Sequence, residues 1–390
     1  MSCYISSNNN RAYVALESSY GGAATVAADQ RIPLVHLTAK QSPVTTDRRD
    51  KTGSRTFAGL PNRIRKTTTF QLNTFMTQWG GAGQAVPQGP LFQGAMGAAP
   101  ASFSGGTVSS VTGQTQITFT AAHGLAVGQG ITVGGEIRFV EALVDSTTVV
   151  VNAPFSVTPG NGTSVGATVT YALATDLPSV TIYDFWDPAT AVQRLLNGAA
   201  MDQMSITVNG DFHEFQFAGP AQDVIDSASF TAGEAGLASY PSEPVSVGFD
   251  QTIVPGHIGQ VWMGSTPNRF YSLTEAQLKL NNQIAQRAQE FGSDVAQCIA
   301  GGQRSVQLDF KIFEQDDAQT KELYQAARSR SPIGAMIQLG EQSGQLLGAY
   351  MPAMVPEVPV FDDQGSRLQW SFSGSRAEGS VDDELYIAFG

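Results

Sequence analysis

Two ten-residue segments far apart in the chain carry the same pattern of apolar positions. KTTTFQLNTF, residues 66–75, aligns without gaps on RSVQLDFKIF, residues 304–313, at an offset of 238 positions. The alignment matches Phe70 with Leu308, Leu72 with Phe310, and Phe75 with Phe313. Alternation of apolar and polar residues is typical of a strand with one buried face. The repeat therefore predicts that one β-rich fold is used twice in this chain.

Each of these strands is followed by a segment with helix signals. After the second strand, Asp317 is a candidate N-cap, and Ser331-Pro332 would end the helix. After the first strand, and much further along the chain, Asp187-Pro188 has the form of an N-cap with a first-turn proline. The apolar stripes expected to face the core are Leu323, Tyr324 and Ala327 in one helix, and Val192, Leu195, Leu196 and Ala199 in the other. One flanking helix is predicted for each copy.

Hairpin signals follow both predicted helices. SITVNGDFHEFQF turns at Asn209-Gly210, a favoured two-residue turn, and AMIQLGEQSGQLLGAY turns through residues 340–344. Asp362-Asp363-Gln364-Gly365 has the composition of a further turn, before a strand with Leu368, Trp370 and Phe372. The two copies thus share the order strand, helix, hairpin.

The first copy is interrupted by about 108 additional residues between its strand and its predicted helix. Residues 80–104 are dominated by Gly, Ala, Pro and Gln, which predicts a connector without packed elements. Residues 105–173 show short apolar strands separated by turn residues, which predicts an inserted β-sandwich domain. The predicted domains are 1–79 with 180–235 as the first copy, 80–104 as the connector, 105–173 as the insertion, and 236–390 as the second copy.

Composition agrees with a mainly β protein. Apolar residues make up 42% and charged residues 14% of the chain, so a packed core is possible. The 41 glycines suit strands joined by tight turns. We find no apolar run of about 18 residues and no signal-peptide pattern at the start. Cys3 and Cys298 are too few and too far apart for a disulfide framework, which favours assembly in a reducing cytoplasm.

Catalytic motifs are not found in the sequence. A phosphate-binding glycine loop, HExxH, paired cysteines and G-x-S-x-G are all missing. His36 and His213 lie within apolar strand patterns, where a structural role is favoured. The carboxylates that cluster are Glu314, Asp316 and Asp317; Asp362 and Asp363; and Asp382, Asp383 and Glu384. Caps and turns explain these clusters, so we expect a protein that is not an enzyme and needs no cofactor or metal.

Basic residues are concentrated near the start of the chain. The first 66 residues hold ten Lys/Arg and four Asp/Glu, a net charge of +6, whereas the whole chain carries −12, which leaves −18 for the remainder. The stretch around Arg48, Arg49, Lys51 and Arg55 is a candidate contact to an acidic surface on another subunit. A DNA-binding loop and a solvated loop without a partner are the alternatives, although an acidic protein does not favour DNA.

The last 120 residues or so resemble the tail tube (major tail) protein of long, non-contractile phage tails. The resemblance lies in the run from EAQLKLNNQIAQRAQEFGSDV through RSVQLDFKIFEQDDAQTKELYQAA and IQLGEQSGQLLGAY to LQWSFSGSRAEGSVDDELYIAFG. It is fainter over residues 31–75 with 187–217, and it does not include the insertion.

The resemblance implies a β-sandwich with one flanking helix whose strands join those of neighbours into a barrel around a DNA channel. A chain with two copies would form a trimeric, pseudo-sixfold ring, and rings would stack head to tail into a tube. It also implies a virion location, assembly in the host cytoplasm, and tape-measure, terminator and initiator proteins as partners. DNA would pass the lumen without specific binding, past an acidic wall. Arg48, Arg49, Lys51 and Arg55 would then be inter-ring contacts.

Two other classes fit the same composition. A β-rich capsid decoration or fibre-like surface protein would form a closed trimer that does not polymerise. A carbohydrate-active β protein would use a carboxylate pair in an aromatic-lined cleft. Trp79, Trp186, Trp262 and Trp370 are dispersed along the chain, which gives this second alternative less support.

Overall fold

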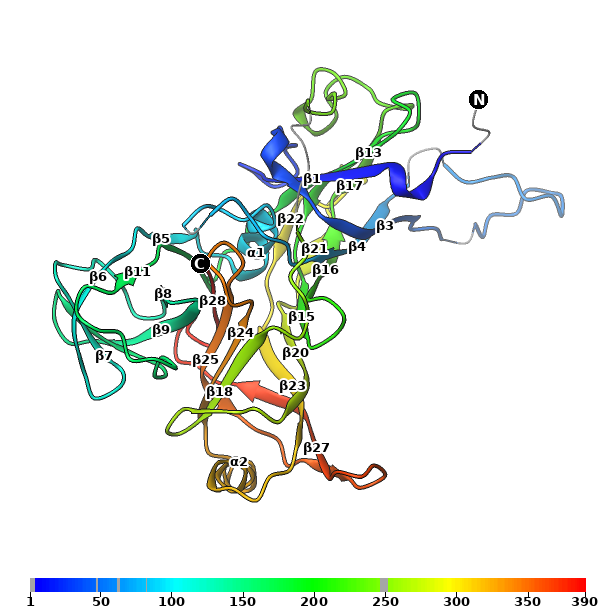
Figure 1. The fold of residues 1–390 in the computed structure, drawn as a ribbon. Helices are drawn as coiled ribbons and strands as arrows, with labels where there is room; N and C mark the ends of the chain where they lie inside the picture. Colours follow the sequence, from blue (N-terminus) through cyan, green and yellow to red (C-terminus); the bar gives the residue numbers. More distant parts are fainter. Residues whose placement is uncertain (1–3, 47, 62–63, 82, 246–251) are drawn as a thin grey trace.

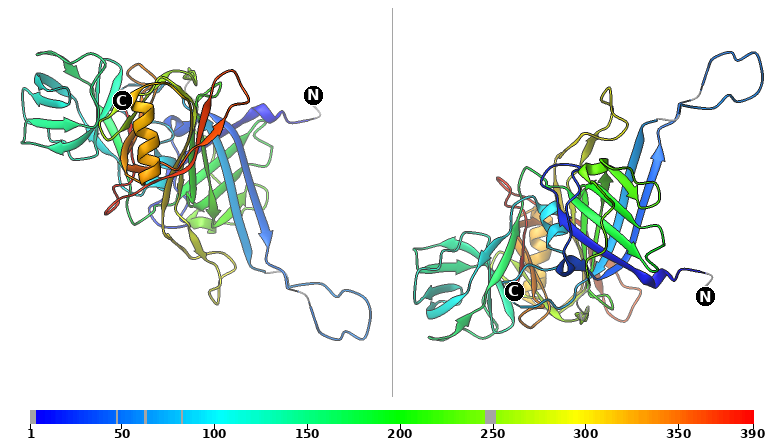
Figure 2. Two further views of the ribbon diagram at one scale, coloured as in Figure 1. Left: turned by 90° about the horizontal axis from the view of Figure 1, so that it is seen from below. Right: turned by 90° about the horizontal axis from the view of Figure 1, so that it is seen from above.

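The computed structural model of the chain describes residues 4–46, 48–61, 64–81, 83–245 and 252–390. It is mainly β, as predicted. Figure 1 shows an elongated body of strands with a small module on one side, and Figure 2 shows an arm, made of the described residues among 44–65, extending from the other side. A short 3-10 turn at Ser7–Asn9 precedes the first strand, and two more at Ala28–Gln30 and Glu234–Gly236 lie between strands.

The body contains two series of strands, each with one helix. The first comprises β1 (Asn10–Leu16), β2 (Arg31–Ile32), β3 (Leu34–Pro43), β4 (Lys66–Phe75), α1 (Gly89–Met96), β13 (Val180–Trp186), β14 (Arg194–Ala199), β15 (Gln203–Val208), β16 (Glu214–Ala221) and β17 (Asp223–Asp226). The second comprises β18 (Gly259–Gly264), β19 (Asn268–Arg269), β20 (Leu273–Asn281), β23 (Ser305–Phe313), α2 (Ala318–Ser329), β24 (Ile333–Leu339), β25 (Leu347–Val355), β26 (Val360–Asp362), β27 (Gln369–Ala377) and β28 (Tyr386–Phe389).

The two series repeat the same strand pairing. In the first, β1 pairs with β2 and β13, β14 with β13 and β17, β16 with β15 and β4, and β4 with β3. In the second, β18 pairs with β19 and β24, β25 with β24 and β28, β27 with β26 and β23, and β23 with β20. When the strands of each series are matched in chain order, every strand pairing of the first series has a counterpart in the second.

The residue-by-residue register of the paired strands also agrees between the two series. A register shift between Val180 and Ile182 of β13 recurs between Ile333 and Ala335 of β24. The 238-residue offset between β4 and β23 also places Phe217 of β16 on Phe372 of β27, because each lies opposite the matched residues Leu72 and Phe310. The strand pairing thus supports the internal duplication that the sequence predicts, and β16 and β17 supply first-copy counterparts of the closing strands.

One antiparallel junction joins the two series. β15 of the first pairs with β20 of the second, from Gln203 opposite Asn281 to Val208 opposite Ala276. The strands β26-β27-β23-β20-β15-β16-β4-β3 are therefore hydrogen-bonded in one continuous path. Their buried faces share one apolar core with both helices.

The inserted module has its own core. β6 (Gly106–Thr112), β7 (Gln116–Phe119), β8 (Gly130–Val133), β9 (Glu136–Leu143), β10 (Thr148–Val151) and β11 (Ser164–Val165) form one sheet in the order β11-β6-β7-β10-β9-β8. A bridge between Thr132 and Gly166 joins its two ends, so this sheet nearly closes into a barrel. β5 (Ala101–Phe103) and β12 (Thr168–Ala172) pair with each other, and β12 pairs with β28 of the body. The module's own strands therefore end at Val165, before the predicted boundary.

The prediction of an unstructured connector over residues 80–104 is wrong. This segment contains α1, with proline in its first turn and Gly97 at φ 99° after its end. Leu91, Phe92, Ala95 and Met96 are buried. The ring of Phe92 lies 5.1 to 5.4 Å from those of Phe215, Phe217 and Phe389. A short apolar cluster is enough for a helix here because the core covers it from several sides.

The predicted helix after Asp187 is also wrong, since residues 194–199 form strand β14. β14 lies between β13 and β17 and is buried from Leu195 to Ala199. A short strand that is buried on both faces does not show the alternation of apolar and polar residues that identifies a half-buried strand. Its apolar residues can then have the spacing of a helix, as they do here. The helix predicted after Asp317 is confirmed as α2, and Asp317 accepts a hydrogen bond from the Thr320 amide. The three predicted hairpins are confirmed as β15–β16, β24–β25 and β26–β27. The predicted two-residue turn at Asn209-Gly210 is wrong, because residues 209–213 connect β15 to β16 and Thr207 lies opposite Glu214.

Candidate assembly surfaces

Two strands of the continuous path have one unpaired side among the described strands. β3 pairs with β4 alone, and β26 pairs with β27 alone. By the correspondence of the two series, β3 is the counterpart of β20, and β26 is the counterpart of β15. The two open edges therefore correspond to the two strand edges that pair with each other in the β15–β20 junction. Open edges present unpaired N–H and C=O groups that favour association with another strand.

Apolar side chains are exposed at the β26 edge. Phe361 is 53% exposed, whereas its counterpart Ile206 in the junction is 2% exposed. Phe361 stacks on Trp370, with ring centroids 5.2 Å apart and planes within 8°, so its orientation is fixed. Val358 and Val360 beside it are also exposed. The sequence analysis did not predict this edge. The apolar residues just before the turn at 362–365, which no predicted element buries, could have indicated it.

The outer face of the joined sheet is polar. Its central strands present Gln203, Ser205, Gln216, Gln277, Lys279 and Gln307, which line a shallow depression. Two pairs of opposite charges lie on this face: Lys279 lies 2.5 Å from Asp309, and Lys311 pairs with Glu275. The face is therefore rich in amide and hydroxyl groups.

The basic residues Arg48, Arg49, Lys51 and Arg55 lie together on the arm between β3 and β4, and all four are exposed. Arg48 binds Asp50 at 2.6 Å and donates to the Gly59 carbonyl at 3.2 Å, which links the two sides of the arm. Hydrogen bonds from Arg48 lower the pKa of Asp50. Figure 2 shows the arm projecting away from the body, where another subunit can reach it.

The predicted carboxylate clusters have local partners. Arg304 binds Asp382 at 2.7 Å and Glu384 at 3.0 Å, and Lys321 binds Asp316 at 2.6 Å. Asp362 accepts from the Gln364 amide within its turn. Among the residues that the structure describes, no group of three or more His, Cys, Asp or Glu could hold a metal ion. Trp79, Trp262 and Trp370 are buried, so their faces serve core packing.

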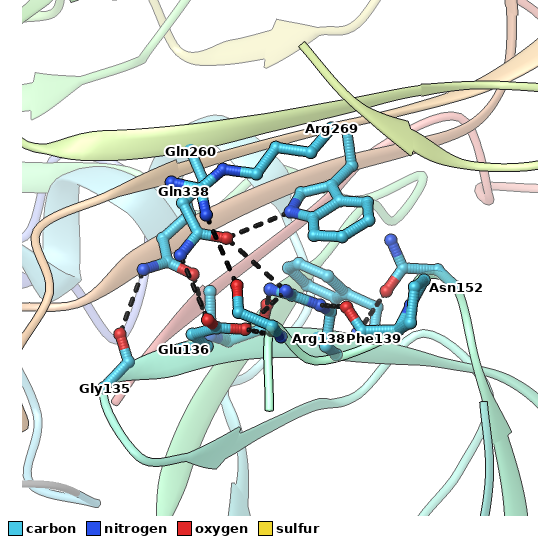
Figure 3. A network of polar contacts seen from close by, with 12 residues as sticks. Gly135, Glu136, Arg138, Phe139, Asn152, Gln260, Arg269 and Gln338 are labelled. Carbon is cyan, nitrogen blue, oxygen red and sulfur yellow. Dashed lines mark hydrogen bonds and ion pairs between the residues drawn. The ribbon is translucent and has the colours of Figure 1, made fainter. Parts of the chain in front are cut away.

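A buried charge network fixes the inserted module to the second series (Figure 3). The side chain of Arg138 on β9 is fully buried, and it binds Glu136 at 2.6 Å. Its guanidinium also donates to the carbonyls of Pro154 and Ile137, at 2.9 and 2.7 Å. The Arg138 guanidinium lies over the Trp262 ring of β18, 4.8 Å from the centroid.

Amide side chains complete this network. Gln260 of β18 donates to Glu136, and its oxygen accepts from the Trp262 indole at 3.0 Å. Gln338 of β24 accepts from the Ile137 amide and donates to the Gly135 carbonyl, both at 3.0 Å. Burial lowers the pKa of Arg138 to about 10, against the opposing effect of Glu136. Burial raises the pKa of Glu136, but hydrogen bonds from Ser156 and the charge of Arg138 outweigh it, and the net shift is downward.

This network holds the module in one orientation relative to the body. Ile137, Phe139 and Ala153 of the module pack with Trp262, Met336 and Tyr350 of the body around it. Buried charges that are fully paired favour one arrangement of the two parts that they join. Any arrangement that separates a pair would leave a buried charge without a countercharge. Figures 1 and 2 show the module on the side of the body opposite the arm that follows β3.

No helix in the described part of the chain has the length and apolar character needed to cross a membrane. A comparison with models of known protein families gives no match, and no curated protein matches the chain.

Proposed function

We propose that this chain is the structural subunit of a tail tube of the long, non-contractile phage type. In this proposal three chains form a pseudo-sixfold ring, and rings stack head to tail around a channel for DNA. The observation that carries the proposal is the pair of open edges, β26 and β3, which correspond to the strands already joined at the β15–β20 junction. A junction that forms within the chain can form again between chains, and its repetition closes a ring.

The register of the intermolecular junction follows from the internal one. Ile206 lies opposite Leu278 in the β15–β20 pairing. The equivalent residues of the open edges are Phe361 of β26 and Ala39 of β3. Covering the exposed half of Phe361 would remove about 100 Å² of apolar surface from water and contribute roughly 2–3 kcal/mol per junction. The ring would therefore bury the apolar residues that the single chain leaves open.

The polar sheet face suits a channel wall. Its amide and hydroxyl groups and paired charges offer few free cations to phosphates, which are the groups that bind DNA with salt-dependent affinity. In the proposed ring this face would turn inward and let DNA slide without specific contacts. Tape-measure, terminator and initiator proteins would act at the ends of such a tube, and the virion would be its final location.

Two edge variants test the ring. Phe361→Asp places a charge on the β26 edge, and Ala39→Asp places one on the β3 edge, so each variant retains one intact edge. We expect wild-type chains to form rings or tubes by negative-stain electron microscopy, and each variant alone to remain monomeric in native mass spectrometry. Mixed in equal amounts, the two variants should form heterodimers and nothing larger, since each complex has one intact junction.

Val157→Asp in the inserted module is the matched control, because Val157 is 82% exposed and lies on neither edge. It should form rings as the wild type does. Circular dichroism would establish that each edge variant is folded. Rings formed by Phe361→Asp alone, or a wild-type chain that stays monomeric at every concentration, would refute the proposal. Closed wild-type trimers that never stack would instead favour a decoration protein.

A further inference from the structure

The second series has an arm equivalent to the basic arm, and this second arm is already docked within the chain. It comprises residues 282–304 between β20 and β23, and includes β21 (Ala285–Arg287) and β22 (Cys298–Ala300). It leaves the sheet at the β15–β20 junction and lies against the first series. Its contacts therefore show how an arm meets the neighbouring copy of the fold.

The docked arm contacts the turn between β16 and β17. The Gln286 side chain donates to the Ala221 carbonyl, and the Gln222 side chain donates to the Ala296 carbonyl, both at 2.8 Å. At the base of the arm, the Ile284 amide donates to Asp202 at 2.6 Å. The Lys66 amide at the start of β4 donates to the Asp294 carbonyl at 2.9 Å.

Each contacted position has a counterpart in the second series. The β16–β17 turn corresponds to the loop of residues 378–385 between β27 and β28. The register of β15 against β16 and β26 against β27 matches Asp202 with Glu357, and the β4–β23 offset matches Lys66 with Arg304. In the proposed ring, the arm of residues 44–65 from one chain would therefore meet these positions on the next chain.

Charge distinguishes the two contacts. Over the stretch equivalent to residues 44–65, the docked arm (residues 282–303) has one Lys/Arg and two Asp/Glu, and the turn that it contacts is uncharged. The arm of residues 44–65 has six Lys/Arg and two Asp/Glu, whereas the loop of residues 378–385 has four acidic residues and no basic ones. Only Asp382 and Glu384 of this loop bind Arg304, and Glu378 is exposed.

We infer that the basic arm of residues 44–65 docks on the acidic loop of residues 378–385 of the adjacent chain in the same ring. This inference rests on the proposed function, and it assigns Arg48, Arg49, Lys51 and Arg55 to a contact within a ring rather than between rings. Opposite charges on two separate segments add attraction and orientation to the head-to-tail contact. At its base the basic arm also meets the docked arm of its own chain, where Arg65 donates to the carbonyls of Gln289 and Glu290 at 2.9 and 3.2 Å.

Cysteine cross-linking tests the geometry. Counting back from β4 and β23, Ala58 matches Ala296 of the docked arm, and Glu378 lies beside the counterpart of Gln222. In a Cys3→Ser/Cys298→Ser background, Ala58→Cys with Glu378→Cys should form disulfide-linked dimers and trimers in isolated rings. Each single cysteine variant should remain a monomer on a denaturing gel.

Charge reversal tests the energetics. Arg48→Glu/Arg49→Glu/Lys51→Glu should raise the concentration needed for ring formation at least about tenfold at low salt. The effect should shrink in 1 M salt, where charges are screened beyond about 3 Å. Adding Glu378→Lys/Asp383→Lys to the same chain should restore assembly. Arg328→Glu, at an exposed residue of α2 that belongs to neither segment, is the control and should have no such effect.

The outcomes separate this inference from the proposed function. Wild-type rings without the 58–378 cross-link, and with an unchanged assembly concentration after charge reversal, would overturn the arm contact while leaving the ring in place. Cross-links found in stacked tubes but not in isolated rings would overturn it in favour of an inter-ring contact. A wild-type chain that forms no rings would overturn both.

Discussion

Replacing Arg138 with methionine should detach the inserted module from its fixed position and destabilise the chain. The Arg138 side chain is fully buried, and Glu136, its partner at 2.6 Å, is 13% exposed. Methionine would fill much of the apolar space beside Trp262 but would supply no donors. The carboxylate of Glu136 would then lose its countercharge, and the carbonyls of Pro154 and Ile137 would lose a hydrogen bond each.

The magnitude follows from the asymmetry of buried ion pairs. Removing one partner of a buried pair costs about 3–5 kcal/mol, whereas replacing both with uncharged groups is often close to neutral. Arg138→Met alone should therefore lower the free energy of unfolding by about 3–5 kcal/mol. Arg138→Met/Glu136→Gln should recover about 1–3 kcal/mol of that loss, since glutamine keeps hydrogen bonds without the charge.

Urea unfolding followed by tryptophan fluorescence at pH 7 measures both variants, because Trp262 lies against the network. Arg287→Met is the control: the Arg287 side chain is 66% exposed and pairs with Glu290 at 3.6 Å on the surface. The control should leave the urea midpoint unchanged. A midpoint for Arg138→Met equal to that of the control would refute the reasoning, as would a double variant less stable than the single one.

Two further predictions concern the core. Phe92→Ala should cost about 3–5 kcal/mol in urea unfolding, because it empties the centre of an aromatic cluster; a cost near that of an exposed loop substitution would show that α1 is not part of the core. His213 is buried, and burial lowers its pKa below the usual value of about 6.5 in spite of its hydrogen bond with the Ile258 carbonyl. The unfolded chain therefore binds a proton more readily, so stability should fall as pH drops below about 6.5. His213→Gln should flatten the dependence of unfolding free energy on pH between about 7.5 and 5.5, and an unchanged slope would contradict this assignment.

The sequence determined the class of the protein and its repeated unit. Alternation in residues 66–75 and 304–313 identified two equivalent strands, because a half-buried strand needs a period of two whatever surrounds it. Local chemistry also sufficed for α2, where Asp317 caps the first turn, and for the existence of the β15–β16 hairpin, although not for the length of its loop. These signals lie within a few residues of one another, so no distant contact was needed to read them.

Only the tertiary structure decided which segments complete each copy. Residues 194–199 became a strand because β13 and β17 cover both of its sides, and residues 89–96 became a helix because aromatic rings from two distant strands surround Phe92. The open edges β3 and β26, and the β15–β20 junction to which they correspond, depend on strand order across the whole chain. Burial and strand order are set by residues far away in the sequence, which local patterns do not encode.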